Sequence, residues 1–251
     1  MPGKIMDNKL YGKRIVWDGD SICAGKAFDD TTETDAWAGR IAEKNLMIYK
    51  NYAKGGGTVT ENVPYSDGVK LRHSVSATLD KMYEENPEAD YIIFEGGSND
   101  ADLLGNVIRG EADRFGMLDP HDFSGEYDRN TFSGALESVF YRATRLWKGK
   151  KIAFIVAHKM GAKNVVGYTA DVNNRRAYFE RAIAICEKWG IPCLDLWKDS
   201  YLNPKLPWMY NMEKTPEENV SDGSFYADGQ HLTAKGYDFT ADVIDSWLKT
   251  L

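Results

Sequence analysis

A serine follows the first apolar run of the chain, in the sequence Gly19-Asp20-Ser21. A serine at a sharp glycine-containing turn between a buried strand and a helix exposes its hydroxyl, and backbone N–H groups at that turn can face an oxyanion. This position suits a nucleophile. The same tripeptide also suits an ordinary N-terminal cap of a helix, so the serine alone does not decide between the two interpretations.

An aspartate and a histidine lie three positions apart near the end of the chain, as Asp228 and His231. At that spacing the carboxylate can fold back within one turn, accept a hydrogen bond from Nδ1–H and leave Nε2 free as a base. The chain has four histidines, and only His231 has an aspartate at this spacing. The alternative is a loop histidine with an accidental acidic neighbour.

Two further motifs could donate hydrogen bonds to an oxyanion. The run Gly55-Gly56-Gly57 lets the backbone approach another group closely. Asn99, in Gly97-Ser98-Asn99-Asp100, offers a side-chain NH₂ where a strand is expected to end. Each motif also has a plain structural interpretation, a flexible turn for the glycines and an Asx turn for Asn99.

The elements that must position these motifs alternate between strands and helices. Short apolar runs predict strands, and apolar residues at helical spacing predict helices. The expected strands are 13–17, 47–53, 90–95, 151–157 and 191–196, and the expected helices are 35–45, 72–85, 131–147, 174–189 and 233–250. This order predicts an α/β fold, a three-layer α/β/α sandwich around a five-stranded parallel sheet of flavodoxin-like type. No linker divides the chain, so we expect residues 1–251 to form a single domain.

Three segments are too long for plain connections: 101–130, 158–173 and 197–230. Long loops in a compact α/β domain are usually functional, and ligands bind beyond the carboxyl ends of parallel strands. The four motifs follow strands or precede the last helix, so we expect them to meet at that edge of the sheet.

Composition narrows the possible partners. Lys plus Arg is 31 and Asp plus Glu is 38, a net charge of −7, which disfavours nucleic acid and anionic lipid as partners. The first fifteen residues lack the apolar region of a signal peptide, and the three cysteines form no C-x-x-C pair. We therefore expect a cytoplasmic setting, with no disulfide framework and no metal site.

Together the four motifs resemble the SGNH/GDSL hydrolases, whose sequence blocks they match in order from about residue 13 to residue 250. The resemblance implies Ser21 as nucleophile, His231 as base and Asp228 as its orienting acid, with no cofactor. It implies an oxyanion hole formed by the N–H groups of Ser21 and Gly56 and the side chain of Asn99. Gly55 stands where the family often has serine, which leaves the choice among Gly55, Gly56 and Gly57 open, although Gly56 is the aligned residue. Asp20 and Asp100 are interpreted as residues that stabilise the turns beside the site.

The expected function is that of a serine esterase that removes short acyl groups, acetyl above all, from carbohydrates through an acyl-enzyme. Aromatic residues of the 197–230 segment could stack on sugar rings, namely Trp197, Trp208 and Tyr210. They could equally pack that segment onto the core or onto another subunit of a homo-oligomer. The alternative functions are a lysophospholipase or thioesterase acting on lipid acyl groups, and a noncatalytic glycan-binding module.

Overall fold

Five parallel strands form the central sheet in the computed structural model, which describes residues 8–25, 36–65, 68–101, 114–161 and 172–251. Their order is β2-β1-β3-β4-β5, so β3 lies at the centre and β2 and β5 at the edges. The strands are β1 (Arg14–Asp18), β2 (Ile48–Asn51), β3 (Tyr91–Glu95), β4 (Lys151–Val156) and β5 (Cys193–Asp195). The α/β fold predicted from the sequence is confirmed, and each observed strand overlaps the range expected for it.

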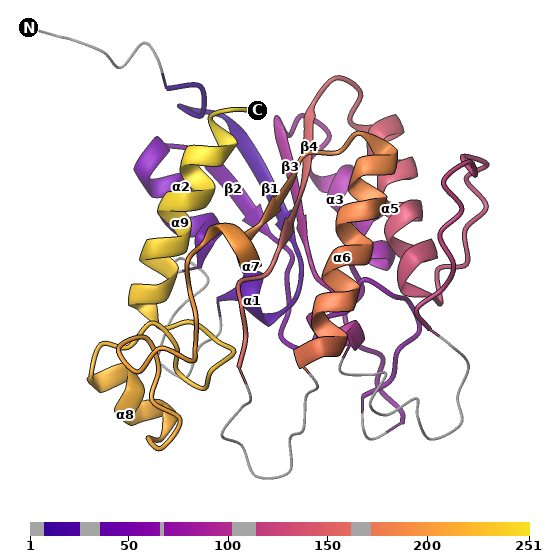
Figure 1. Cartoon of the computed structure of the whole chain (residues 1–251). Helices are drawn as coiled ribbons and strands as arrows, with labels where there is room; N and C mark the ends of the chain where they lie inside the picture. Colours follow the sequence, from indigo (N-terminus) through magenta and orange to yellow (C-terminus); the bar gives the residue numbers. More distant parts are fainter. Residues whose placement is uncertain (1–7, 26–35, 66–67, 102–113, 162–171) are drawn as a thin grey trace, which may run out of the picture.

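Helices cover both faces of the sheet (Figure 1). One face carries α2 (Trp37–Asn45) and α9 (Ala234–Leu248). The other carries α3 (Val75–Glu85), α5 (Phe132–Leu146) and α6 (Val172–Trp189). Because both faces are covered, every residue of β3 is buried, which is why the strands are nearly continuous apolar runs.

Three short helices were not predicted from the sequence, because they are too short to show the helical spacing of apolar residues. They are α1 (Ser21–Ala24), α7 (Leu196–Asp199) and α8 (Pro216–Ser221). A capping box starts α8, in which the Thr215 hydroxyl accepts from the Glu218 N–H and the Glu218 carboxylate accepts from the Thr215 N–H. None of the helices in the described part of the chain is both long and apolar enough to span a bilayer.

The C-terminal helix is fastened to the serine turn at the start of the chain. The Tyr237 hydroxyl donates a buried hydrogen bond of 2.8 Å to the Ile22 carbonyl. Trp37 packs edge-on against the Tyr237 ring at 6.0 Å and donates from Nε1 to the Thr240 hydroxyl at 2.7 Å. These contacts set the position of α9, and therefore of the residues just before it, relative to α1.

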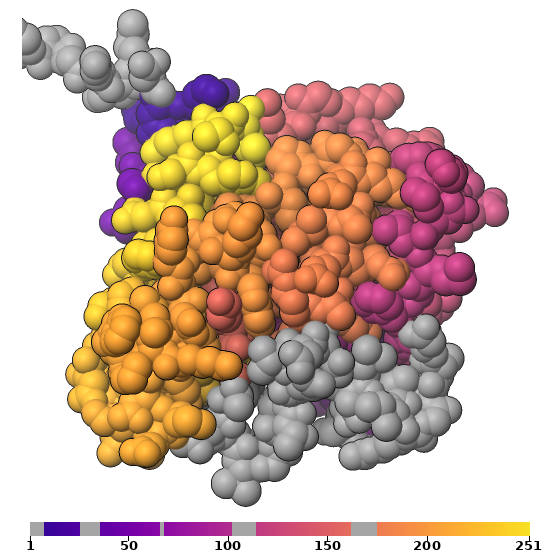
Figure 2. All heavy atoms as spheres, in the orientation of Figure 1, coloured from indigo at the N-terminus to yellow at the C-terminus, as the bar shows by residue number. Residues whose placement is uncertain are grey.

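The segment between α7 and α9 forms a lobe of its own beside the helices (Figure 2, orange to yellow). The buried side chain of Asn219 holds this lobe together, because its Nδ2 donates to the carbonyls of Asn211 at 2.9 Å and Ala227 at 3.2 Å. A buried amide that satisfies several loop carbonyls gives a long connection a defined shape. The lobe contains Asp228 and His231 near its C-terminal end.

Thr240→Val should lower the free energy of unfolding by about 1–3 kcal/mol, because the buried N–H of Trp37 is left without an acceptor. Urea unfolding of the wild type and the variant measures the change. Thr250→Val is the matched control, since the Thr250 hydroxyl makes an exposed bond to the Trp247 carbonyl. Equal losses in the two variants would contradict this account of how α9 is anchored.

Candidate active site

Ser21 opens the short helix α1 immediately after β1. The preceding Asp20 caps this helix, because its Oδ1 accepts from the Ile22 N–H at 2.8 Å. Gly19 leaves no room for a side chain, since a Cβ would lie 2.7 Å from Oε2 of Glu95 and 2.8 Å from Cβ of Cys23. The strand can therefore turn sharply into the helix only with glycine at this position, and the turn places Ser21 at the end of β1.

Asp228 and His231 form a tight turn before α9. Oδ1 of Asp228 accepts from the backbone N–H groups of Gln230 at 3.0 Å and His231 at 2.7 Å. Oδ2 of Asp228 lies 2.9 Å from Nδ1 of His231. Gly229 has a φ of +80°, which lets the backbone fold back between the two side chains. The carboxylate thus fixes both the backbone and the ring of His231.

The structure brings Ser21, His231 and Asp228 together in one line. Oγ of Ser21 lies 2.9 Å from Nε2 of His231, although the two residues are 210 positions apart in the sequence. An ionised Asp228 carboxylate can only accept a hydrogen bond, so the ring of His231 carries its proton on Nδ1. The lone pair on Nε2 then faces the serine hydroxyl. This arrangement can remove a proton from a hydroxyl as that hydroxyl attacks an electrophile.

Asn99 follows β3 and reaches the same turn, yet both of its N–H groups have acceptors. Nδ2 donates to the Gly57 carbonyl at 2.8 Å and, over a longer 3.3 Å, to Oδ2 of Asp20. The sequence predicts that this amide donates to an oxyanion, whereas in the structure its N–H groups bind two protein oxygens.

Gly56 lies in the loop that follows β2. Its φ is +73°, and its own carbonyl accepts from Nη1 of Arg72 at 3.0 Å. Among the described residues the Gly56 N–H donates no hydrogen bond. The neighbouring Gly57 N–H, in contrast, donates to the Lys54 carbonyl at 2.9 Å. Of these two glycines, Gly56 therefore has the backbone donor that is open to another group.

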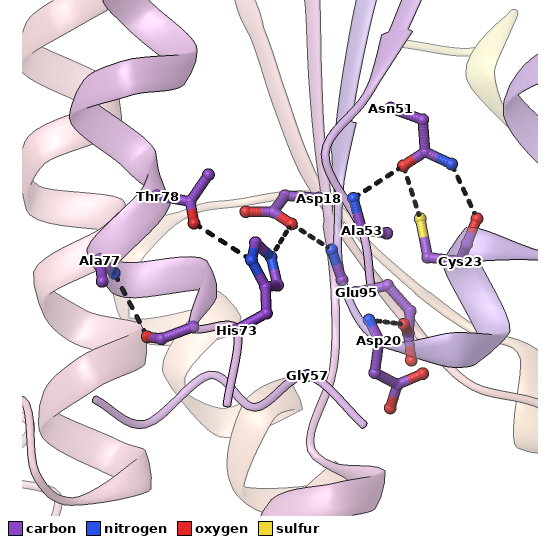
Figure 3. Close-up of polar contacts among 12 residues, drawn as sticks. Asp18, Asp20, Cys23, Asn51, Ala53, Gly57, His73, Ala77, Thr78 and Glu95 are labelled. Carbon is purple, nitrogen blue, oxygen red and sulfur yellow. Dashed lines mark hydrogen bonds and ion pairs between the residues drawn. The ribbon is translucent and has the colours of Figure 1, made fainter. Parts of the chain in front are cut away.

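A buried glutamate, which the sequence motifs did not indicate, forms a hydrogen bond with the serine turn. Glu95 is the last residue of β3, and its Oε2 accepts from the Asp20 N–H at 3.1 Å (Figure 3). Burial, and after it the nearby Asp20 carboxylate, raises the pKa of Glu95 well above its usual range, so we expect it to hold a proton. The signal for it in the sequence is a charged residue that closes an otherwise apolar strand.

Asp100 binds the backbone of the segment that follows the three glycines. Its carboxylate accepts from the backbone N–H groups of Val59 and Thr60, both at 3.0 Å. Burial raises the pKa of Asp100, while these donors and the Thr60 hydroxyl act against that shift. Asp20 and Asp100 are both buried and both bind backbone around the site.

His158 is a second missed residue, located just after β4. Its Nε2 lies 2.7 Å from the carbonyl of Gln230, the residue before His231. Burial lowers the pKa of His158 to about 4, so the ring is neutral near pH 7 and Nε2 carries the proton that it donates. His158 thus holds the backbone next to His231, and Arg175 adds a bond from Nη2 to Oε1 of Gln230 at 3.1 Å.

The three aromatic residues expected to bind substrate do not share one surface. Tyr210 is buried in the core and packs against Tyr226 at 6.3 Å, so the prediction that it stacks on sugar is wrong. Trp197 is half-buried and packs edge-on against Phe179 at 5.8 Å. Trp208 alone of the three is exposed, at 67%. Tyr210 thus packs into the hydrophobic core, as the alternative interpretation predicts for these aromatic residues.

Within the described residues, no group of three or more His, Cys, Asp or Glu side chains could hold a metal ion. The buried carboxyl groups near Ser21 accept hydrogen bonds from backbone N–H groups.

A sequence model of the GDSL-like lipase/acylhydrolase family matches residues 19–239. Similar solved structures include a protein from Lactobacillus plantarum, 21% identical, covering 96% of this chain and 98% of that chain with a TM-score of 0.69. The native aryl esterase of M. smegmatis is 13% identical, with 96% and 100% covered and a TM-score of 0.66. A carbohydrate acetylesterase family member from Sinorhizobium meliloti is 13% identical, with 95% and 98% covered and a TM-score of 0.63. These likenesses show a shared fold, and no curated protein matches the chain.

Glu95→Gln should keep the fold and change how stability depends on pH. The folded protein holds the Glu95 proton above the ordinary glutamate pKa of about 4.3, whereas the unfolded chain releases it there. The wild type should therefore lose stability relative to the variant as pH rises above that value, by up to about 1.4 kcal/mol per pH unit until the folded-state pKa is passed. Urea unfolding of both proteins across this range measures the difference.

Glu88→Gln, at an exposed glutamate, is the control and should follow the wild type at every pH. A stability difference between Glu95→Gln and the wild type that stays constant with pH would show that Glu95 is ionised in the folded protein.

Proposed function

Since the chain belongs to the GDSL-like lipase/acylhydrolase family, we propose that it is a serine esterase that removes acetyl and other short acyl groups from carbohydrates. Membership of this hydrolase family confirms the resemblance predicted from the four sequence motifs. The observation that carries the proposal is the 2.9 Å contact between Oγ of Ser21 and Nε2 of His231, with Asp228 on the other ring nitrogen.

The first step of the proposed reaction forms an acyl-enzyme. Oγ of Ser21 attacks the ester carbonyl while Nε2 of His231 takes the hydroxyl proton. The imidazolium that results is stabilised by the Asp228 carboxylate, 2.9 Å from Nδ1. The tetrahedral intermediate then collapses, its C–O bond to the sugar breaks, and His231 gives the proton to the departing sugar oxygen. Water then attacks the acyl-enzyme carbonyl, with His231 again taking the proton. This step releases acetate and restores Ser21.

The oxyanion formed in each step needs donors that point at it. We assign this role to the N–H groups of Ser21 and Gly56 and to Nδ2 of Asn99. When the oxyanion forms, it takes the place of Oδ2 of Asp20, the more distant of the two acceptors of Asn99. Burial raises the pKa of Asp20 above its usual range. One such donor typically contributes about 3 kcal/mol to transition-state stabilisation.

The carbohydrate part of the proposal rests on an exposed aromatic and on one structural neighbour. Trp208, at 67% exposure on the lobe before Asp228, offers a ring on which a sugar can stack. A similar structure belongs to a carbohydrate acetylesterase family member. The likeness to an aryl esterase makes an aryl acetate the practical substrate for first assays.

Ser21→Ala should lower kcat by at least about 10³-fold, because the nucleophile is lost. Acetate release from an acetylated oligosaccharide, and nitrophenol release from p-nitrophenyl acetate, measure the change. Ser221→Ala, at an exposed serine of α8, is the matched control and should keep wild-type activity.

Undiminished turnover in Ser21→Ala would refute the assigned nucleophile. A wild type that hydrolyses no ester of any type but binds glycans would instead favour the binding-module alternative.

The rate on p-nitrophenyl esters should fall as the acyl chain is lengthened beyond four carbons. A site adapted to acetyl gains no binding energy from further methylene groups, whereas a lipid acyl hydrolase gains about 0.8 kcal/mol for each one that it buries. The comparison uses kcat/KM for the acetate, butyrate, octanoate and laurate esters. Rates that rise toward the octanoate would show that the enzyme is a lipid or thioester acyl hydrolase.

A further inference from the structure

A second histidine–carboxylate pair lies at the end of β1, and the reaction proposed above does not use it. Asp18 ends β1, and its fully buried Oδ1 lies 2.6 Å from Nε2 of His73, whose side chain is 9% exposed (Figure 3). The same oxygen accepts from the Gly19 N–H at 2.8 Å. Nδ1 of His73 lies 3.4 Å from the Thr78 hydroxyl, in the first turns of α3. Both ring nitrogens of His73 are therefore engaged by protein groups.

The pair contacts the serine turn at one end. Gly19 separates Asp18 from Asp20 and Ser21, so the bond from the Gly19 N–H to Asp18 fixes the start of that turn. The Gly19 carbonyl in turn accepts from the Lys54 N–H at 3.2 Å, which binds the start of the glycine loop to the same residue. A shift of Asp18 would therefore move the serine turn and the glycine loop together.

The His73 end of the pair contacts the glycine loop. A Cβ on Gly57 would lie 3.1 Å from Cδ2 of His73 and 3.0 Å from the Gly19 carbonyl oxygen, so the ring and the serine turn enclose this residue. The His73 carbonyl also accepts from the Thr58 N–H at 2.9 Å. The Gly57 carbonyl accepts from Nδ2 of Asn99. The ring of His73 thus supports the peptide that holds the Asn99 side chain.

We propose that Asp18 and His73 are positioning residues for the oxyanion hole, because they hold the Gly55–Thr58 loop against the serine turn. The inference rests on the proposed esterase function and adds to it a pair of residues that do not touch the substrate. Transition-state stabilisation by oriented donors depends on their being held in place before the reaction. Removing the pair should therefore weaken the binding of the oxyanion more than the binding of the ground-state ester.

The experiment compares three substitutions of His73 in the full chain. His73→Leu and His73→Asn both remove the bond to Asp18, the first with an apolar side chain and the second with an amide that is too short to reach. His73→Gln places an amide N–H near the position of Nε2 and can restore the bond. His121→Gln, at an exposed histidine, is the matched control and should leave activity unchanged.

The readouts are kcat and KM for p-nitrophenyl acetate and the inhibition constant of phenylboronic acid, which forms a tetrahedral anion on a catalytic serine. We expect kcat to fall about 10- to 100-fold in the Leu and Asn variants, with KM within about twofold of the wild type, and boronate binding to weaken by a similar factor. His73→Gln should recover most of the lost kcat. Thermal unfolding identifies any variant that does not fold, and the Asn variant then carries the comparison if the Leu variant fails.

Wild-type kcat in a folded Leu or Asn variant would overturn the inference, as would a loss confined to KM or an equal loss in the Gln variant. These outcomes differ from a failure of the proposed function itself, which would appear as an inactive wild type or as full activity in Ser21→Ala.

Discussion

The hydrogen bond between Ser21 and His231 joins the two ends of the chain, and the candidate site exists only while that contact holds. Neither residue sets the distance by itself. It depends on the docking of α9, through the bonds from Tyr237 to the Ile22 carbonyl and from Trp37 to Thr240. His158 also holds the backbone next to His231, because it binds the Gln230 carbonyl. Packing far from the hydroxyl therefore determines whether it meets its base.

A second constraint is the burial of carboxyl groups at the C-terminal ends of β1 and β3. Asp18, Asp20, Glu95 and Asp100 are all buried, and burial raises the pKa of each. Isolated buried acids destabilise a fold, but each of these accepts at least one hydrogen bond from a backbone N–H group. They connect the turns that carry Ser21, Gly56 and Asn99, so the polar groups are arranged before any substrate arrives.

The sequence was sufficient to predict the sheet, because strands covered on both faces must be continuous apolar runs. It also singled out Ser21, Asp228 and His231, and the structure brings these three side chains into contact. Position after a strand and short spacing along the chain are visible in the sequence itself. The partners of Glu95 and His73 could not be predicted, because they depend on strands and loops that become neighbours only in three dimensions. His73 and Asp18 are 55 positions apart, and no local pattern links them.

The aromatic residues of the lobe show a different limit of sequence analysis. Tyr210 and Trp208 are two positions apart and belong to the same chemical class, yet one is buried and the other is exposed. A segment without regular periodicity does not indicate which of its side chains face the core. The acceptors of Asn99 were missed for the same reason, since the Gly57 carbonyl and Asp20 come from two other segments.

The most direct test of the central claim is to treat the folded protein with a fluorophosphonate and locate the adduct by peptide mass spectrometry. The account predicts a single adduct on the peptide that contains Ser21, formed quickly in the wild type and lost in His231→Ala. Labelling of a different serine, or equal labelling of Ser21 without His231, would contradict it.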